Sequence, residues 1–200
     1  MKIKKLNRKD FSKVIQYAIK GMRFDEYLKS NFLLQAYGRY FWYLEYTNAT
    51  QVIAAYEGNE LLGVLVADMK GEPKPYKSIW KGLYVKLVDV IQKKFFGGGV
   101  MPYNEANEAM YAKYTKQNTP DGEIRFLAAN PDSKVNGVGT FLLNELAKRE
   151  QGKEIYLYTD TNCTYQFYEH RGFERVGEQE IMLELQDGVD LKCLMYRKIL

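Results

Sequence analysis

Hydrophobic and polar positions change their spacing along the chain, and each change marks a predicted element. Apolar and charged residues alternate over residues 1–6, which predicts a short strand. Either Asn7 or Asp10 can cap a helix after it, and the apolar face of that helix is Phe11, Val14, Ile15, Ala18 and Ile19. A second helical region is predicted over about 25–46. It is aromatic on nearly every face, which is typical of a helix that is buried or borders a cleft.

Two β-type runs follow, at 51–56 and 60–69, and the turn between them predicts a hairpin. The next segment, 70–122, interrupts this rhythm. It contains a proline loop, a helix predicted over about 76–96, the triplet Gly97-Gly98-Gly99, and a second helix over about 103–114. This segment is too small to hold its own core, so it is interpreted as an insertion rather than a separate domain.

From residue 123 onward, predicted strands and helices alternate. The strands cover about 123–130, 154–159, 174–185 and 190–199, and the helices cover about 137–150 and 164–170. This order predicts an α/β fold in which helices cover a sheet. The chain of 200 residues is long enough for one ordinary domain, so a single domain over 1–200 with a helical insertion at about 70–122 is expected.

Composition narrows the classes of function. The formal net charge of +4 is too small to indicate a nucleic-acid partner. Two distant cysteines and one histidine exclude a zinc site built from four cysteines, or from two cysteines and two histidines, and no metal is expected. No stretch has the length of a membrane span, and no apolar signal segment follows the charged N-terminus. A cytoplasmic protein without a membrane partner is therefore predicted.

The segment 131–140 is the most informative part of the sequence. It joins an apolar strand to an amphipathic helix and contains Gly137 and Gly139, which permit a sharp turn and close approach of a ligand. The free amides and the dipole at the start of a helix favour an anion such as a pyrophosphate. The alternative is that these glycines only permit packing. Neither a Walker motif nor the dinucleotide-binding glycine pattern is present, since position 142 is Leu.

Two motifs resemble a known family. Lys134-Val135-Asn136-Gly137-Val138-Gly139 resembles the Q/R-x-x-G-x-G/A signature of the GNAT superfamily of N-acetyltransferases, with Lys134 in place of Gln or Arg. Residues 155–162 and the run Phe167-Tyr168-Glu169-His170-Arg171-Gly172-Phe173 resemble the later strand and the "FYEKxGF" helix end of that family. The resemblance covers about 123–176. It implies a mixed, mostly antiparallel sheet flanked by helices, with strands 123–130 and 154–159 diverging to admit coenzyme A, and here a helical insertion before the central strand.

The resemblance implies that acetyl-CoA, as co-substrate, donates an acetyl group to a primary amine in a ternary complex. Tyr168 matches the general acid that protonates the leaving thiolate, or else it is a core tyrosine. Glu123, at a spacing similar to that of the base in the histone-acetylating branch, is a candidate general base, or else simply solvated. The residues that match cofactor contacts are Leu127, Ala128, Ala129, Lys134, Val135, Asn136, Gly137, Val138, Gly139, Thr140 and Asn162. Ordinary strand packing at 127–129 and a helix cap at Asn162 are the alternatives.

Several alternatives remain open from the sequence. A small-molecule amine is favoured because a long insertion that closes over a cleft suits a small ligand, while a protein amine and an acyl-CoA sensor without turnover are the rivals. The insertion is either a mobile lid or part of the core. The apolar residues of its first helix need to bury, and the aromatic helices at 25–46 offer a partner; these residues are Ile79, Trp80, Leu83, Val85, Leu87, Val88 and Ile91. The lysines of 70–94 are spread along it, which argues against a membrane-surface helix. A homodimer is compatible with the sequence. His170 is not expected to be catalytic, and Cys163 is interpreted as a packing residue.

Overall fold

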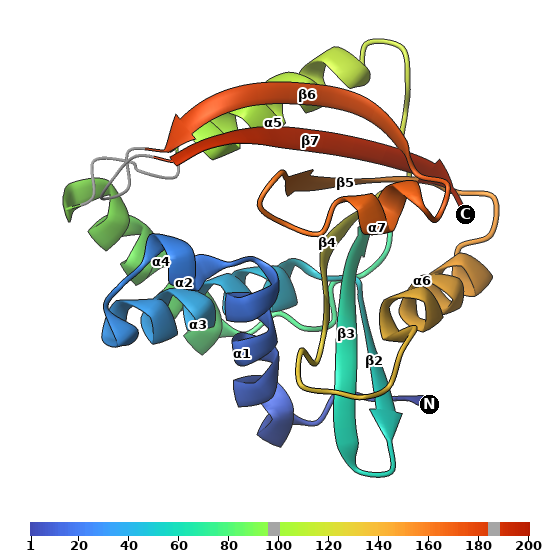
Figure 1. Ribbon diagram of the computed structural model, residues 1–200, viewed down its shortest axis with the longest axis horizontal. Helices are drawn as coiled ribbons and strands as arrows, with labels where there is room; N and C mark the ends of the chain where they lie inside the picture. The colour runs from blue at the N-terminus through green and yellow to red at the C-terminus, as the bar shows by residue number, and fades with distance from the viewer. Residues whose placement is uncertain (96–100, 184–188) are drawn as a thin grey trace.

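The computed structural model describes residues 1–95, 101–183 and 189–200 (Figure 1), so Gly97-Gly98-Gly99 lies outside the described residues. The described strands form one sheet of seven in the order β1-β2-β3-β4-β5-β7-β6. They are β1 (Lys2–Lys4), β2 (Gln51–Glu57), β3 (Glu60–Met69), β4 (Gly122–Ala129), β5 (Glu154–Asp160), β6 (Glu174–Leu183) and β7 (Val189–Ile199). Helices flank this sheet, as the fold class predicted from sequence requires.

The sheet opens between its two central strands. Every neighbouring pair is antiparallel except β4 and β5, which are parallel. Their pairing is restricted to Gly122 opposite Ile155 and Glu123 opposite Tyr156. Beyond these residues β4 pairs with β3 alone, and Figure 1 shows β4 and β5 running apart. The divergence of the two central strands is therefore confirmed.

Helices cover both faces of the sheet. α6 (Val138–Arg149) packs on one face, and α1 (Phe11–Gly21) and α3 (Asn31–Asn48) pack on the other over β2, β3 and β4. α5 (Met101–Tyr114) packs under β6 and β7. Alternate residues of β5 show which face α5 covers, because Ile155 and Leu157 pack with α6 whereas Tyr156 and Tyr158 pack with α5. Thus α5 and α3 lie on the same face, opposite α6.

The aromatic segment 25–46 is not one helix. A short α2 (Phe24–Tyr27) is separated from α3 by extended backbone at Leu28. The helix predicted after Asn7 is preceded by a 3-10 turn, Arg8–Asp10, in which the Asn7 side chain accepts a hydrogen bond from the Lys9 amide. The sequence missed both breaks because they depend on single backbone angles rather than on the spacing of apolar residues.

The two helices of the insertion differ in their packing. α5 contributes Ala106, Met110 and Tyr114 to a buried cluster with β6 and β7, so this half of the insertion is core. α4 (Ile79–Phe95) packs on α3 instead. The core alternative therefore holds for α5, and the lid interpretation of α4 stays a prediction. Among the described residues, no helix has the length and apolar character needed to cross a membrane.

Candidate active site

A β-bulge lies at the point where the central strands separate. Phe126 pairs with Val66 and Ile124 pairs with Ala67, so Arg125 is the extra residue of β4. Ile124 and Phe126 would share a face in a regular strand, yet Ile124 packs with the α6 core and Phe126 with the α1–α3 core. The bulge therefore turns the Arg125 side chain toward α3, beside that of Glu123.

Arg125 lies between two carboxylates. Its Nε donates to Glu45 Oε2 at 2.6 Å, and its Nη1 donates to Glu123 Oε2 at 3.2 Å. Glu45 is buried on α3, and burial raises its pKa to about 7 although the charge of Arg125 opposes that rise. Glu45 was missed at sequence level because nothing in the pattern of α3 marks it as a partner of β4.

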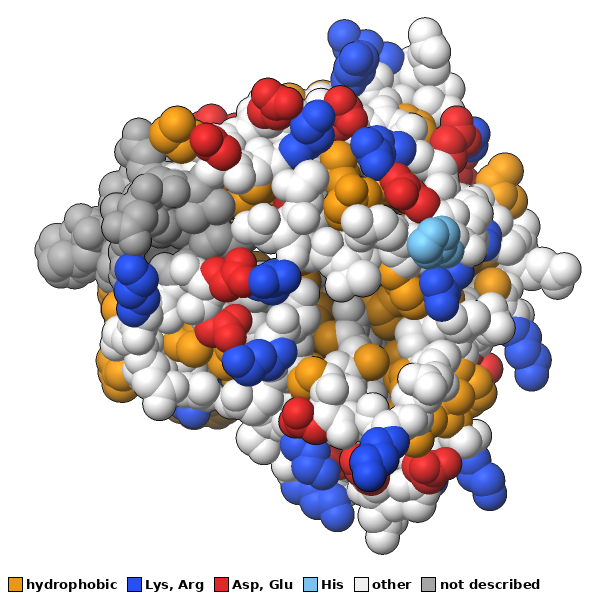
Figure 2. Space-filling view, in the orientation of Figure 1, with side chains coloured by type: hydrophobic (Ala, Val, Ile, Leu, Met, Phe, Trp, Pro, Cys, Tyr) orange, Lys and Arg blue, Asp and Glu red, His pale blue; other side chains and the backbone are white. Residues whose placement is uncertain are grey.

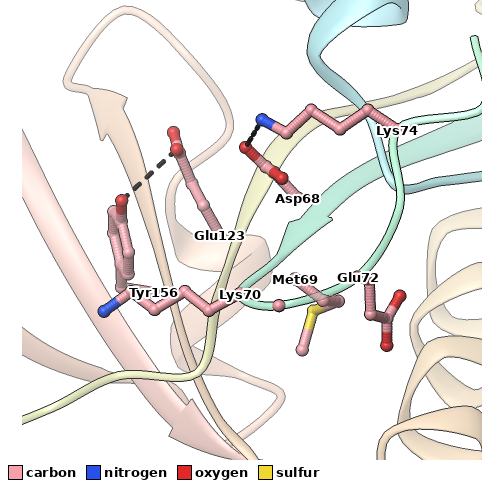
Figure 3. Close-up of a pocket in the computed structure, with 9 residues that line it drawn as sticks. Asp68, Met69, Lys70, Glu72, Lys74, Glu123 and Tyr156 are labelled. Carbon is pink, nitrogen blue, oxygen red and sulfur yellow. Dashed lines mark hydrogen bonds and ion pairs between the residues drawn. The ribbon is translucent and has the colours of Figure 1, made fainter.

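Glu123 borders a cavity of about 240 Å³ at the closed end of the gap (Figure 3). The cavity is formed by the end of β3, the following loop to Lys74, the start of β4, and Tyr156. Glu123 Oε2 also accepts a hydrogen bond from the Tyr156 hydroxyl at 3.3 Å, whereas Oε1 accepts none from any described residue. Burial raises the pKa of Glu123, and Arg125 opposes the rise. A carboxylate with one free oxygen and a raised pKa is suited to accept a proton.

Tyr156 forms the other wall beside Glu123 and belongs to a cluster of tyrosines from α5 and β5. The Tyr111 and Tyr156 rings lie 4.9 Å apart between centroids, and the Tyr156 and Tyr158 rings lie 5.4 Å apart. Burial raises the pKa of Tyr158, and the negative charges of Glu123 and Glu108 add to the rise. The wall therefore combines electron-rich ring faces with nearby carboxylates, which together favour a cation.

The predicted anion site is a helix start without a side-chain cap. Gly137 occupies the N-cap position of α6 with φ of 78°, and no side chain caps the helix there. Residues other than glycine rarely adopt this backbone angle, which explains the glycine. Lys134 and Asn136 are exposed in the turn, whereas Val135 and Val138 pack against the core beneath α6. The amides of the first turn are thus free for a ligand, as the fit of a pyrophosphate requires.

Gly139 fits the packing alternative that the sequence left open. A Cβ at this position would lie 2.7 Å from the Phe167 ring, so the second glycine of the motif allows Phe167 to pack on α6. The guanidinium of Arg171 stacks on the same Phe167 ring, 3.8 Å from its centre. Its Nε donates to Thr140 Oγ1 at 2.7 Å. This hydrogen bond keeps the positive charge of Arg171 beside the first turn of α6. Arg171 was not identified as a candidate site residue from the sequence.

Tyr168 lies on the short helix α7 (Gln166–Glu169). Its ring contacts the Phe167, Phe173 and Tyr196 rings, which fits the alternative of a core tyrosine. Its hydroxyl, however, has no hydrogen-bond partner within the described ranges of the chain. Burial raises the pKa of Tyr168, so the phenol keeps its proton at neutral pH. A protonated hydroxyl without a partner remains available to a ligand.

The remaining predicted contacts lie along the opened strands. Leu127, Ala128 and Ala129 pair with β3 on one side, and on the other side β4 has no strand partner beyond Glu123 among the described residues. Asn162 follows β5, and its backbone amide donates to Asp160 Oδ1 at 2.9 Å. The unpaired edge of β4 could receive an extended ligand as an added strand. Figure 2 shows the molecule in the orientation of Figure 1, and the face toward the viewer is hollowed near its middle, with hydrophobic side chains at the base of the hollow.

Neither His170 nor Cys163 has the surroundings of a catalytic residue. His170 is exposed at the end of α7. Cys163 is half-buried, and burial together with the charge of Asp160 raises the pKa of its thiol to about 12. A thiol with so high a pKa is a poor nucleophile at neutral pH.

Comparisons with known proteins identify the fold. No protein-family model matches this sequence, and no curated protein matches it either. Among solved structures, the chain is similar to a Corynebacterium glutamicum protein described as histone acetyltransferase HPA2 and related acetyltransferase. That match has 19% identity and a TM-score of 0.60, and covers 98% of this chain and 94% of the other.

Two further similar structures carry a named substrate or ligand. One is a Drosophila melanogaster polyamine N-acetyltransferase that forms N-acetylagmatine, with 12% identity and a TM-score of 0.58 over 100% of this chain and 99% of the other. The other is the PaiA N-acetyltransferase of Thermoplasma acidophilum in complex with coenzyme A, with 15% identity and a TM-score of 0.53 over 100% and 98%. At these identities the likeness concerns the fold, and the chain has the GNAT fold.

Proposed function

On this GNAT fold, we propose that the protein is an N-acetyltransferase that transfers the acetyl group of acetyl-CoA directly to the primary amine of a small molecule. The observation that carries the proposal is the opened sheet, because a helix start without a side-chain cap, an unpaired strand edge, the helix α7 that carries Tyr168 and a half-buried carboxylate all border one gap (Figure 1). Likeness to acetyltransferases, including a coenzyme A complex, supports the same activity.

The residues present fit coenzyme A. The free amides at the start of α6 and the charge of Arg171 beside Thr140 suit the pyrophosphate, and the open edge of β4 at 127–129 suits the pantetheine arm. When bound, acetyl-CoA supplies an activated acetyl group as a thioester. Gly137 keeps the turn in the left-handed conformation that directs these amides outward.

Glu123 is proposed to remove the proton from the amine. An ammonium group must lose a proton before its nitrogen can attack, and Glu123 Oε1 is free to accept that proton directly or through a water in the cavity. Its raised pKa brings its basicity closer to neutral pH. Arg125 and Tyr156 hold the other carboxylate oxygen and so fix the orientation of the group.

Tyr168 is proposed to supply the proton to the departing thiolate. Its hydroxyl carries a proton at neutral pH and has no hydrogen-bond partner among the described residues. The acid and the base come from different elements, α7 and β4, so each can serve a different side of the gap. This division of roles matches the two proton transfers that acyl transfer to an amine requires.

A small cationic amine is the acceptor that the wall beside Glu123 favours. Tyr156 lines the cavity there, the rings of Tyr111 and Tyr158 pack against it, and Glu108 adds negative charge near Tyr158. α5 is packed firmly against the sheet on this side, which narrows the approach compared with the open groove that a peptide needs. A polyamine acetyltransferase among the similar structures supports this class of acceptor.

The test is a direct assay of thiol release. The protein and acetyl-CoA are mixed with one candidate acceptor per reaction, namely a small polyamine, an amino sugar or a peptide with a free N-terminus. The acetylated product is then identified by its mass. Release of thiol with small amines is expected, with loss of turnover in Glu123→Gln when the protein remains folded. Binding of acetyl-CoA without release would support a sensor, and product from peptides alone would support a protein acceptor.

A further inference from the structure

The outer face of α4 is apolar and exposed. Ile79 is 88% exposed and Trp80 is 80% exposed. The exposed large hydrophobic side chains of this helix are Ile79, Trp80, Leu83, Leu87, Val90 and Ile91. They recur at intervals of three and four residues, so they form one continuous stripe along the helix. The sequence predicts that the apolar residues of this helix bury against the aromatic helices, and that prediction is wrong for Ile79, Trp80, Leu83, Leu87 and Ile91, whereas Val85 is buried.

The opposite face of α4 is already held by α3. Tyr84 donates its hydroxyl hydrogen bond to the Ala36 carbonyl at 3.1 Å, and Tyr40 donates to Asp89 Oδ1 at 2.7 Å. Val85 is buried between these contacts. Because α4 is attached through this face, the apolar stripe cannot turn inward without breaking them. The stripe therefore requires a partner from outside the described part of the chain.

The exposed charges along the stripe have one sign. Over 76–91, the exposed ionisable side chains are Lys77 and Lys86. Asp89 is bonded to Tyr40, and the ammonium of Lys81 faces the rings of α1 and α3, 5.5 Å from the Tyr43 ring centre. The spread of lysines along the sequence argued against a membrane-surface helix, but the structure removes Lys81 and Asp89 from the outer face and leaves apolar and cationic groups there.

We propose that α4 binds flat to an anionic lipid surface, with its stripe in the interfacial region and Lys77 and Lys86 beside the lipid phosphates. An amphipathic helix with Trp and Leu on its apolar face and lysines at its border has the composition of an interfacial anchor. Charge decides between lipid and a second copy of the chain. Lys86 lies at the border of the stripe, midway along its length, so an α4–α4 contact would bring two lysines together, and over 79–91 that face of the helix has no carboxylate to pair with them.

Trp80 reports this contact directly. The chain has two tryptophans, and Trp42 is fully buried, so a change in emission on binding comes from Trp80. Mixed phosphatidylcholine–phosphatidylglycerol vesicles should shift the emission to shorter wavelength and sediment the protein. Vesicles of phosphatidylcholine alone should do so much less, and added salt should weaken the binding because it screens the lysines.

Variants of the stripe distinguish specific binding through α4 from nonspecific adsorption of the protein to vesicles. Leu83→Gln with Leu87→Gln should weaken sedimentation with the anionic vesicles by at least about tenfold, since apolar area drives insertion. Lys86→Gln should weaken it and reduce its dependence on salt. Ile199→Gln is the matched control and should leave binding unchanged, because Ile199 is 59% exposed at the C-terminal end of β7, which Figure 1 shows on the opposite side of the view from α4.

Three results would overturn the proposal. The first is an unchanged Trp80 emission with no sedimentation on anionic vesicles. The second is equal binding to both kinds of vesicle, which would remove the role of charge. The third is a dimer in sedimentation velocity that Leu83→Gln with Leu87→Gln converts to a monomer, which would assign the stripe to a second copy of the chain. None of these readouts depends on acetyltransferase activity.

Discussion

Arg125 Nε donates a hydrogen bond to Glu45 Oε2 at 2.6 Å, and this contact links β4, beside the gap between the central strands, to α3. The two residues lie 80 positions apart in the chain. Arg125 reaches Glu45 because the bulge in β4 turns its side chain toward α3. The same guanidinium also contacts Glu123, so the position of α3 affects the orientation of the proposed base.

The pH dependence of stability tests the state of Glu45. Its pKa in the folded protein, about 7, lies above its ordinary value in the unfolded chain, so the folded state takes up a proton more readily. The stability gained in this way is complete below the unfolded pKa and is lost as the pH rises toward about 7. Over that window the free energy of unfolding should fall relative to that of Glu45→Gln, by at most about 3 kcal/mol. Urea unfolding of both proteins at several pH values measures this, and parallel curves would mean that Glu45 stays charged.

The anion site can be tested with two matched glycines. Gly137 has φ of 78° and Gly152 has φ of 81°, and a Cβ at either position would meet nothing within 4 Å. Valine should therefore strain the backbone equally at both, at a cost of about 1–2 kcal/mol. Only Gly137→Val should weaken coenzyme A binding, by at least about tenfold, because its side chain enters the phosphate path at the start of α6. Calorimetry measures the affinity of the two folded variants for coenzyme A. Equal affinity in both would mean that the turn at Gly137 does not bind the cofactor.

Tyr168→Phe tests the proposed general acid. The substitution keeps the ring contacts and removes the hydroxyl, so turnover should fall by about 100- to 10,000-fold while acetyl-CoA binding is nearly unchanged. Tyr196→Phe is the control, because the neighbouring Tyr196 hydroxyl is bonded to Glu169 rather than free, and most of the turnover should remain. Steady-state kinetics over a range of pH measures both. Equal turnover in Tyr168→Phe and wild type at every pH would make Tyr168 structural.

The two halves of the insertion should respond differently to truncation of a side chain. Met110 on α5 is buried against β6 and β7, so Met110→Ala should lower the free energy of unfolding by about 2–5 kcal/mol. Leu83 on α4 is exposed, and Leu83→Ala should change it by less than about 0.5 kcal/mol. Denaturant unfolding compares them. A chain in which a Gly/Ser linker replaces 71–121 should fail to fold, because it lacks α5; a soluble, coenzyme A-binding product would contradict the assignment of α5 to the core.

Local sequence determined the elements that surround the gap. The strand, glycine turn and helix over 122–149 follow from short-range signals, namely an apolar run, a residue that accepts a positive φ, and a helical period of apolar residues. The same holds for the hairpin of β2 and β3. The motifs from 134 to 139 and from 167 to 173 then predicted the GNAT fold, whereas the single domain and the roles of Tyr168 and Glu123 remain predictions.

Tertiary structure decided which side chains meet. The pairing register of β3 with β4 places the bulge at Arg125, and no local pattern encodes that register. Phe167 packs against Gly139 only because the tertiary fold places α7 beside α6. Packing therefore explains Gly139, whereas backbone conformation explains Gly137. The sequence predicts that the apolar face of α4 is buried, because helical periodicity identifies an apolar face but does not show what covers it. In the folded chain, the tyrosines of α3 and α4 hold the opposite face, and that choice leaves the stripe exposed.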